Sequence, residues 1–169
     1  VDDEAELGCA CVDFGGGTTS VAVFANGALI HMDAVAVGGQ HVTLDVARGL
    51  NIRLSAAERL KTLYGSALPS SADDRETFAI EQVGEETGRA SHVPRSHLVR
   101  IIRPRVEEIV ELARDRLRNA GHPTHAGSRI VVTGGASQLT GLAETARRIF
   151  GGQTRMGRPA GVQGDRKST

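Results

Sequence analysis

One stretch decides the fold of this chain: Asp13-Phe14-Gly15-Gly16-Gly17-Thr18-Thr19. It follows an apolar run, Cys9 to Val12, that is typical of a β-strand. Three glycines let bare backbone N–H groups approach a phosphate, because a side chain there would hold the ligand away. Thr18 and Thr19 add hydroxyl donors, and the Asp13 carboxylate can hold Mg²⁺ through its water shell. The stretch predicts a phosphate-binding turn, although a glycine triplet alone also fits a flexible turn between strands.

The composition is that of an ordinary globular protein, since 40% of the 169 residues are hydrophobic and 24% are charged. The 20 basic and 20 acidic residues cancel and aromatic residues make up only 3%, so nothing points to nucleic acid. No apolar run reaches the length of a membrane span. Cys9 and Cys11 are expected to be small buried thiols in a reducing cytoplasm. The histidines are scattered and are not expected to bind a metal, but His41 is a candidate helix cap or phosphate neighbour.

Strand and turn signals continue after the glycine stretch. Thr18 to Phe24 and Leu29 to Val37 read as two strands joined by Asn26-Gly27, the strongest short hairpin signal. Together with Cys9 to Val12 they predict a three-stranded meander. Gly38-Gly39 ends the third strand, and a helix whose first amides can face an anion is predicted from the apolar residues Val42, Val46, Ala47 and Leu50.

Two further helices are predicted in the middle of the chain. Ser55 is an N-cap candidate with Glu58 as its capping-box partner. A long helix that ends at Gly121 is predicted from one apolar face, formed by Leu98, Ile102, Val106, Ile109, Ala113 and Leu117. Pro104 lies inside this helix, so we expect either a kink or two helices joined end to end. Residues 66–95 read as a small insertion of short strands and loops.

A second ligand-facing turn is predicted near the end of the chain. Ile130 to Val132 reads as a short buried strand that ends in Thr133-Gly134-Gly135-Ala136-Ser137. A helix that reaches Gly151 follows, with the apolar residues Leu139, Leu142, Ala146 and Ile149. A strand, a glycine pair and a helix commonly form a ligand-binding turn. Residues 153–159 predict an edge strand, and residues 160–169 read as a polar tail.

Five ordered blocks resemble the FtsA family of bacterial cell division proteins. They are Val12 to Thr19, Val37 to Thr43, Ala57 to Lys61, Pro104 to Ile109 and Val131 to Leu139. More broadly, the chain is similar to the second half of the actin, sugar kinase and Hsp70 ATPase superfamily. The resemblance implies an α/β fold: an actin-like ATPase lobe, with a ribonuclease H-like three-stranded meander, strand–helix units and a small inserted α/β subdomain. It implies a nucleotide-binding subdomain at residues 7–53 and 122–160, an inserted subdomain with the long helix at 54–121, and a flexible tail at 161–169.

The resemblance also implies a site for ATP and Mg²⁺. The second phosphate loop would be formed by Asp13, Gly15, Gly16, Gly17, Thr18 and Thr19. The adenosine would be bordered by Gly134, Gly135, Ala136 and Ser137. Glu58 and Lys61, one helical turn apart, would approach the ribose and base. The competing interpretations are the capping box for Glu58 and a solvated helix lysine for Lys61. Ser20 departs from the family, which usually has an acidic residue there.

The resemblance also implies a partner, because in the FtsA family a helix that carries Pro-Arg-x-x-Glu binds the C-terminal tail of the tubulin-like division protein FtsZ. The matching residues are Pro104, Arg105 and Glu108. Arg105 can form a forked pair with a tail carboxylate, and Glu108 can take a basic residue. The alternative is that these charges form an ordinary solvated helix face. The resemblance also implies possible self-association into actin-like filaments, and a place on the cytoplasmic face of the inner membrane at the division site.

Two parts of the family pattern are not found in this sequence. About a dozen residues precede Asp13, too few for the lobe that supplies the first phosphate loop. We therefore expect a fragment with half of an ATP site that does not hydrolyse ATP alone, from a parent that is at most a weak ATPase. No basic amphipathic stretch follows Gly157, so we expect membrane contact only through a helix absent from this chain.

The resemblance implies an ATP-binding cell division scaffold that binds the FtsZ tail and links the division ring to the inner membrane. Two other functions stay open from the sequence. One is the nucleotide-binding half of a sugar- or acetate-kinase-like enzyme, and the other is a different actin-like assembly ATPase, such as one for pilus assembly or a chaperone.

Overall fold

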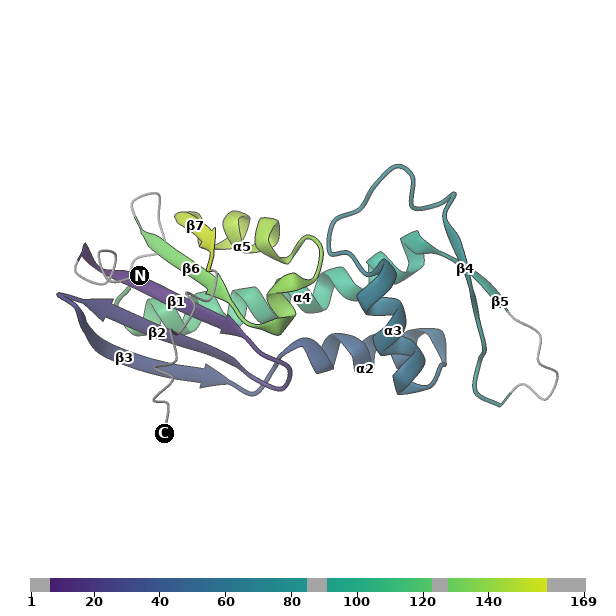
Figure 1. Ribbon diagram of the computed structural model, residues 1–169, viewed down its shortest axis with the longest axis horizontal. Coiled ribbons are helices and arrows are strands. Elements are labelled where there is room, and N and C mark those ends of the chain that lie inside the picture. The colour runs from purple at the N-terminus through teal and green to yellow at the C-terminus, as the bar shows by residue number, and fades with distance from the viewer. Residues whose placement is uncertain (1–6, 85–90, 123–127, 158–169) are drawn as a thin grey trace, which may run out of the picture.

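A computed structural model describes residues 7–84, 91–122 and 128–157. Figure 1 shows an elongated α/β body, with a five-stranded sheet at one end and a two-stranded sheet at the other. The long helix α4 (Arg95–Asn119) connects the two ends and packs along the larger sheet. The strand order in that sheet is β3-β2-β1-β6-β7. The predicted α/β architecture is confirmed.

The predicted meander forms one half of the larger sheet. It consists of β1 (Cys9–Phe14), β2 (Thr19–Ala25) and β3 (Ala28–Val35), each antiparallel to the next. Asn26 and Gly27 both have positive φ, 51° and 74°, as a tight hairpin with right-handed strand twist requires. The hairpin prediction from Asn26-Gly27 is therefore confirmed.

The other half of the sheet is parallel. β6 (Arg129–Thr133) pairs with β1, and β7 (Gln153–Met156) pairs with β6 after the crossover helix α5 (Leu142–Phe150). The edge strand predicted from residues 153–159 is thus confirmed, whereas the polar tail at 160–169 lies outside the described residues. Leu139 was predicted inside the last helix, and this is wrong. A separate 3₁₀ turn, η1 (Gly135–Gln138), precedes it, and Gly141, with φ 86°, separates this turn from α5.

The remaining elements come between the meander and β6 in the sequence. They are α2 (Gly39–Leu50), α3 (Leu54–Tyr64), and the paired strands β4 (Thr77–Ile80) and β5 (Ser91–Pro94) of the predicted insertion. α4 runs without interruption through Pro104, so the two-helix alternative is wrong. The capping-box prediction is also wrong, because Arg53 is the N-cap of α3 and Ser55 lies in its first turn.

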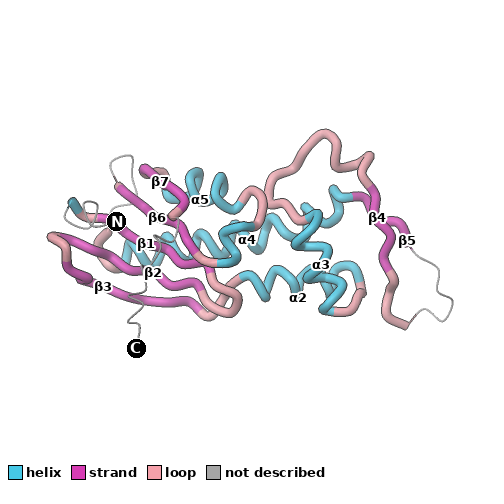
Figure 2. Tube along the Cα trace, in the orientation of Figure 1, coloured by secondary structure: helices cyan, strands magenta, loops and turns pink. Residues whose placement is uncertain are grey.

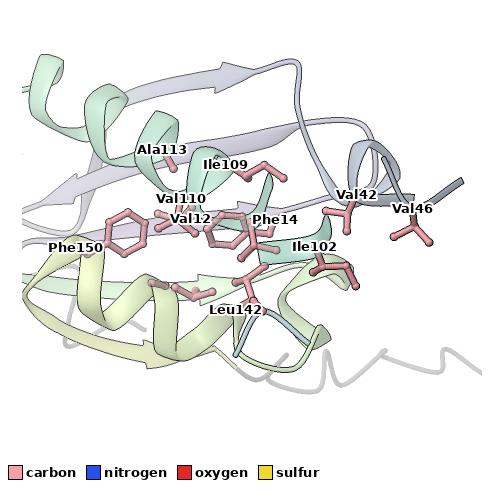
Figure 3. Close-up of a cluster of buried hydrophobic side chains, with 14 of the residues drawn as sticks. Val12, Phe14, Val42, Val46, Ile102, Ile109, Val110, Ala113, Leu142 and Phe150 are labelled. Carbon is pink, nitrogen blue, oxygen red and sulfur yellow. The ribbon is translucent and has the colours of Figure 1, made fainter. Parts of the chain in front are cut away.

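The core lies between the sheet and the helices. Val12 and Phe14 of β1 are fully buried, and Figure 3 shows them among side chains of α4 and α5. The apolar face predicted for α4 is buried along its whole length, from Leu98 to Leu117. Burying a side chain of this size contributes roughly 1.5–3 kcal/mol before conformational entropy is counted. One hydrophobic cluster includes side chains from both predicted subdomains, and the subdomain boundaries remain a prediction.

The two faces of the meander differ. The strand register puts Val12, Val21 and Asp33 on one face, and Arg116 of α4 pairs with Asp33, so α4 covers this face. Met32 lies on the other face and is 70% exposed. Within the described parts of the chain, no helix has the length and apolar character needed to cross a bilayer.

Candidate functional site

The glycine loop after β1 sits directly on the start of α2. The N–H groups of Gly39 and Gln40 donate to the carbonyl oxygens of Gly15 and Gly16, at 2.9 and 2.8 Å. A Cβ at Gly38 would lie 2.5 Å from the Gly15 oxygen, so only glycine permits this approach. The first amides of α2 were predicted to face an anion, and this is wrong because two of them bind the loop.

His41 caps α2, as predicted for one of its two possible roles. Its Nδ1 accepts a hydrogen bond from the Gly38 N–H at 3.1 Å. This bond satisfies an amide that precedes the helix and has no partner within it. The imidazole therefore helps to fix the junction between β3 and α2.

The tip of the glycine loop keeps open amides. Gly15 donates to the Thr18 carbonyl at 3.0 Å, which closes the turn. Gly16 and Gly17 are exposed, and their N–H groups have no hydrogen-bond partner within the described part of the chain. Thr18 is exposed beside them, whereas Thr19 is fully buried and its hydroxyl donates to the Val37 carbonyl at 2.8 Å. The loop can thus offer two amides and one hydroxyl to an anion.

The second predicted turn lies against the glycine loop. Asp13 and Thr133 are register partners at the ends of β1 and β6, and a Cβ at Gly134 would lie 2.2 Å from Asp13 Oδ1. Ser137 is buried and its hydroxyl donates to the Gly134 carbonyl at 2.5 Å, so it holds the turn closed. Ala136 meets the start of α2, where a Cβ at Gly39 would lie 2.9 Å from the Ala136 Cβ. Both turns and the start of α2 therefore converge.

Lys61 of α3 joins α3 to α2. Its ammonium lies 3.2 Å from the Gly39 carbonyl, 2.8 Å from the Thr43 hydroxyl and 2.8 Å from the Glu58 carboxylate. The side chain is only 14% exposed. The interpretation of Lys61 as a solvated helix lysine is therefore wrong. Because an ammonium has three N–H donors, these three acceptors use all of them.

Glu58 stands at the exposed end of this network. Its Oε2 accepts hydrogen bonds from Lys61 and from the Thr43 hydroxyl, so it does not act as the cap that the capping-box interpretation required. Burial raises the pKa of Glu58, but the hydrogen bonds from Lys61 and Thr43 and the Lys61 charge outweigh it, so the pKa lies below its ordinary value. Glu58 Oε1 has no partner among the residues that the structure describes. It is free to accept from a hydroxyl or amine.

A cavity of about 840 Å³ opens beside these residues, a volume typical of ligand sites. Five of the predicted residues line it: Gly16, Glu58, Lys61, Gly135 and Ala136. The other predicted residues, which are not among those lining the cavity, are Asp13, Gly15, Gly17, Thr18, Thr19, Gly134 and Ser137.

Sequence reasoning assigned no role to Gln40 and Thr43, polar residues that also line the cavity. Gln40 lies over the loop, since a Cβ at Gly16 would meet its side chain at 3.5 Å. A buried threonine on the apolar face of a predicted helix was the available signal for Thr43.

The predicted partner residues on α4 are engaged within the fold. Arg105 Nε and Nη2 donate to the two carboxylate oxygens of Asp45 in α2, at 2.6 and 3.2 Å, and Nη1 donates to Glu108 at 2.6 Å. The hydrogen bond to Asp45 is the largest influence that raises the Arg105 pKa above its ordinary value. Arg105 is 28% exposed and Glu108 is 51% exposed. A solvated helix face therefore does not describe Arg105.

Comparison with known proteins identifies the family of the chain. The family profile described as "Cell division protein FtsA" matches residues 10–169. The chain belongs to the FtsA family. Cell division proteins FtsA of Rhizobium meliloti and Agrobacterium fabrum are 56% and 55% identical to it over 165 residues, or 97% of the chain. The chain spans 37% of the length of each.

A solved structure shows the fold of this FtsA-family chain. MreB 5 of Spiroplasma citri, solved with AMPPNP bound, superposes with a TM-score of 0.75 over 92% of this chain and 50% of that chain, at 21% identity. The actin-like fold predicted from the sequence is thus confirmed. Since the family consists of cell division proteins, the kinase-like alternative loses its support.

Proposed function

We propose that this chain is the lobe of a cell division scaffold that forms one wall of an ATP site and binds the FtsZ tail. The whole protein would link the division ring to the cytoplasmic face of the inner membrane, and no residue described here is assigned to that link. The observation that carries the nucleotide part is the pair of open amides at Gly16 and Gly17, beside a cavity lined by Glu58 and Lys61.

The loop residues suit a nucleotide tail. The amides of Gly16 and Gly17 and the Thr18 hydroxyl would bind phosphate oxygens. Asp13 is exposed at the end of β1 and would hold Mg²⁺ through water, and Mg²⁺ when bound neutralises phosphate charge. No group of three or more His, Cys, Asp or Glu gathers to hold a metal in the described regions. The remaining Mg²⁺ ligands would therefore be phosphate and water.

Glu58 and Lys61 take different roles in this proposal. Glu58 Oε1 is open and would accept from a ribose hydroxyl. The three N–H groups of Lys61 donate to Gly39, Thr43 and Glu58, so Lys61 is a positioning residue that fixes α3 against α2. Gly135 and Ala136 also line the cavity and would border the adenosine.

We propose binding rather than turnover for this chain alone. Hydrolysis needs a group that positions the attacking water, and the proposal assigns that role to none of the described residues. We expect the chain alone to bind ATP without hydrolysing it.

The FtsZ tail would bind α4 at Arg105 and Glu108. A tail carboxylate would compete with Asp45 for the Arg105 guanidinium, and Glu108, being half exposed, would take a basic residue. The tail would then lie next to α2, the helix whose first amides bind the glycine loop.

Fluorescence anisotropy with a labelled FtsZ C-terminal peptide tests the partner part. We expect saturable binding that Arg105→Glu reduces at least tenfold, because the carboxylate meets a like charge. Arg114→Glu is the matched control, since Arg114 is also an ion-paired arginine of α4. No binding by the folded chain, or an equal loss with both variants, would remove the tail from the proposal.

A fluorescent ATP analogue with Mg²⁺ tests the nucleotide part separately. We expect binding that unlabelled ATP displaces and that ends when Mg²⁺ is chelated. A folded chain that shows no displaceable binding would limit the proposal to the partner site.

A further inference from the structure

The outer strand β3 carries an apolar surface that the proposed function does not use. Among the strands that the structure describes, β3 pairs only with β2 and forms one edge of the larger sheet (Figure 2). The Ala34 N–H on this strand donates to the Asp33 carboxylate at 2.7 Å, and no described strand pairs with the outer edge. Leu29, Ile30 and Met32 of this strand are 51%, 60% and 70% exposed. Exposed apolar outer strands favour pairing with another strand, and proteins usually guard them with charges.

Two polar side chains on β3 flank Met32. His31 pairs with Val23 and Asp33 pairs with Val21, so both lie on the face that α4 covers. Met32 pairs with Ala22 on the opposite face. An imidazole and a carboxylate thus stand one position to either side of Met32, and the carboxylate also pairs with Arg116 of α4.

We propose that β3 pairs with β3 of a second copy of this chain, antiparallel, around a two-fold axis at Met32. Residues opposite each other then have numbers that are symmetric about 32. His31 faces Asp33 of the partner subunit, and this pair occurs twice. Ile30, which lies at a register shift of β3 against β2, comes close to Ala34 of the partner subunit, a large side chain beside a small one. The two five-stranded sheets become continuous, and both edges gain main-chain hydrogen bonds.

The polar side chains favour this register over its neighbours. An axis at Asp33 would set the two Asp33 carboxylates opposite each other, and an axis at His31 would remove the pairing of imidazole with carboxylate. Two carboxylates directly opposite each other on a sheet repel, whereas an imidazole can donate a hydrogen bond to a carboxylate. An axis between two residues is excluded, because residues that face each other must lie on the same face of the sheet. The exposed apolar side chains favour association, and the pair of His31 with Asp33 of the partner subunit fixes its geometry.

Cysteine cross-linking tests the register. In the chain with Cys9→Ala and Cys11→Ala, Met32→Cys sets two thiols opposite each other at the axis. Ile30→Cys is the matched control, since that side chain is also exposed but its copies would lie about 14 Å apart along the strands. We expect Met32→Cys to form disulfide-linked dimer at least tenfold faster under mild oxidation. Equal rates for the two variants would overturn the proposed pairing.

Sedimentation of the native chain tests the association itself. We expect a concentration-dependent dimer over the micromolar range that Met32→Lys converts to monomer, because two ammonium groups would meet at the axis. Leu63→Lys, at a 59% exposed leucine on α3, should leave the dimer intact. A native chain that is monomeric at every concentration, or a dimer that survives Met32→Lys, would overturn the proposal.

Discussion

Arg105 of α4 and Asp45 of α2 form a forked ion pair across 60 residues of sequence. The same α2 begins on the glycine loop, where the amides of Gly39 and Gln40 bind the loop carbonyls. The proposed nucleotide site and the proposed partner site are thus joined to one helix, the first at its start and the second within it. A displacement of α2 at the loop would move Asp45 and so change its ion pair with Arg105.

Asp45→Asn should tighten binding of the FtsZ tail about threefold to tenfold, because the Arg105 guanidinium loses its charged internal partner. The folded chain should lose only about 0.5–1 kcal/mol, since the pair is partly exposed. Peptide anisotropy and urea unfolding measure the two effects. Asp115→Asn, which removes the partner of Arg114 on α4, is the control. Weaker tail binding by Asp45→Asn would instead mean that Asp45 positions Arg105 for the tail.

Glu58 should make stability depend on pH. Its folded-state pKa lies below the ordinary value of 4.5, so its contribution is complete above that pH and is lost as the pH falls through the folded pKa. The difference in unfolding free energy between the native chain and Glu58→Gln should therefore be constant near neutral pH and shrink in acid. Urea unfolding from pH 7 to pH 3 measures it, with Glu111→Gln on α4 as the control. A difference that grows in acid would contradict the assignment.

Local patterns predicted most of the fold. The glycine stretch with Asn26-Gly27 gave the meander, because hairpin turns demand positive φ and only a few residues supply it. The apolar spacing from Leu98 to Leu117 gave α4, because one face had to be buried. Pro104 did not end the helix, since packing along the whole apolar face outweighs one missing hydrogen bond.

Contacts between segments that are distant in the sequence could not be predicted from local sequence patterns. Glu58 had a valid capping signal, but Lys61 and Thr43 bind its carboxylate, and Thr43 comes from another helix. Asp45 could not be assigned to Arg105 from spacing, because their meeting depends on how α2 crosses α4. The amides at the start of α2 looked open to an anion, yet the loop carbonyls reach them through space.

Thr43→Val should destabilise the fold by about 1–3 kcal/mol, because it keeps the shape but leaves Lys61 and Glu58 each short of a partner. Urea unfolding at neutral pH measures the loss. Thr62→Val is the matched control, since the Thr62 hydroxyl is exposed and donates only to the Glu58 carbonyl. A loss no larger than that of the control would show that Lys61 and Glu58 do not depend on the Thr43 hydroxyl.

Gly38→Ala and Gly16→Ala should separate folding from ligand binding. A Cβ at Gly38 would lie 2.5 and 2.6 Å from the carbonyl oxygens of Gly15 and Gly16, which are backbone atoms that cannot move aside. We expect a loss of about 1–3 kcal/mol and a lower Tm. A Cβ at Gly16 meets only the Gln40 side chain, at 3.5 Å, so Gly16→Ala should fold normally.

The same Gly16→Ala methyl stands at the open tip of the loop, where a phosphate would approach the amides. The affinity of the Gly16→Ala variant for a fluorescent ATP analogue should therefore fall at least tenfold, while the Tm of the variant stays within a few degrees of the native value. Gly27→Ala tests the opposite end of β2, where φ is 74° and nothing lies within 4 Å of the added Cβ. It should lower Tm through backbone strain without changing nucleotide affinity. Unchanged affinity in Gly16→Ala would show that the glycine loop serves the fold alone.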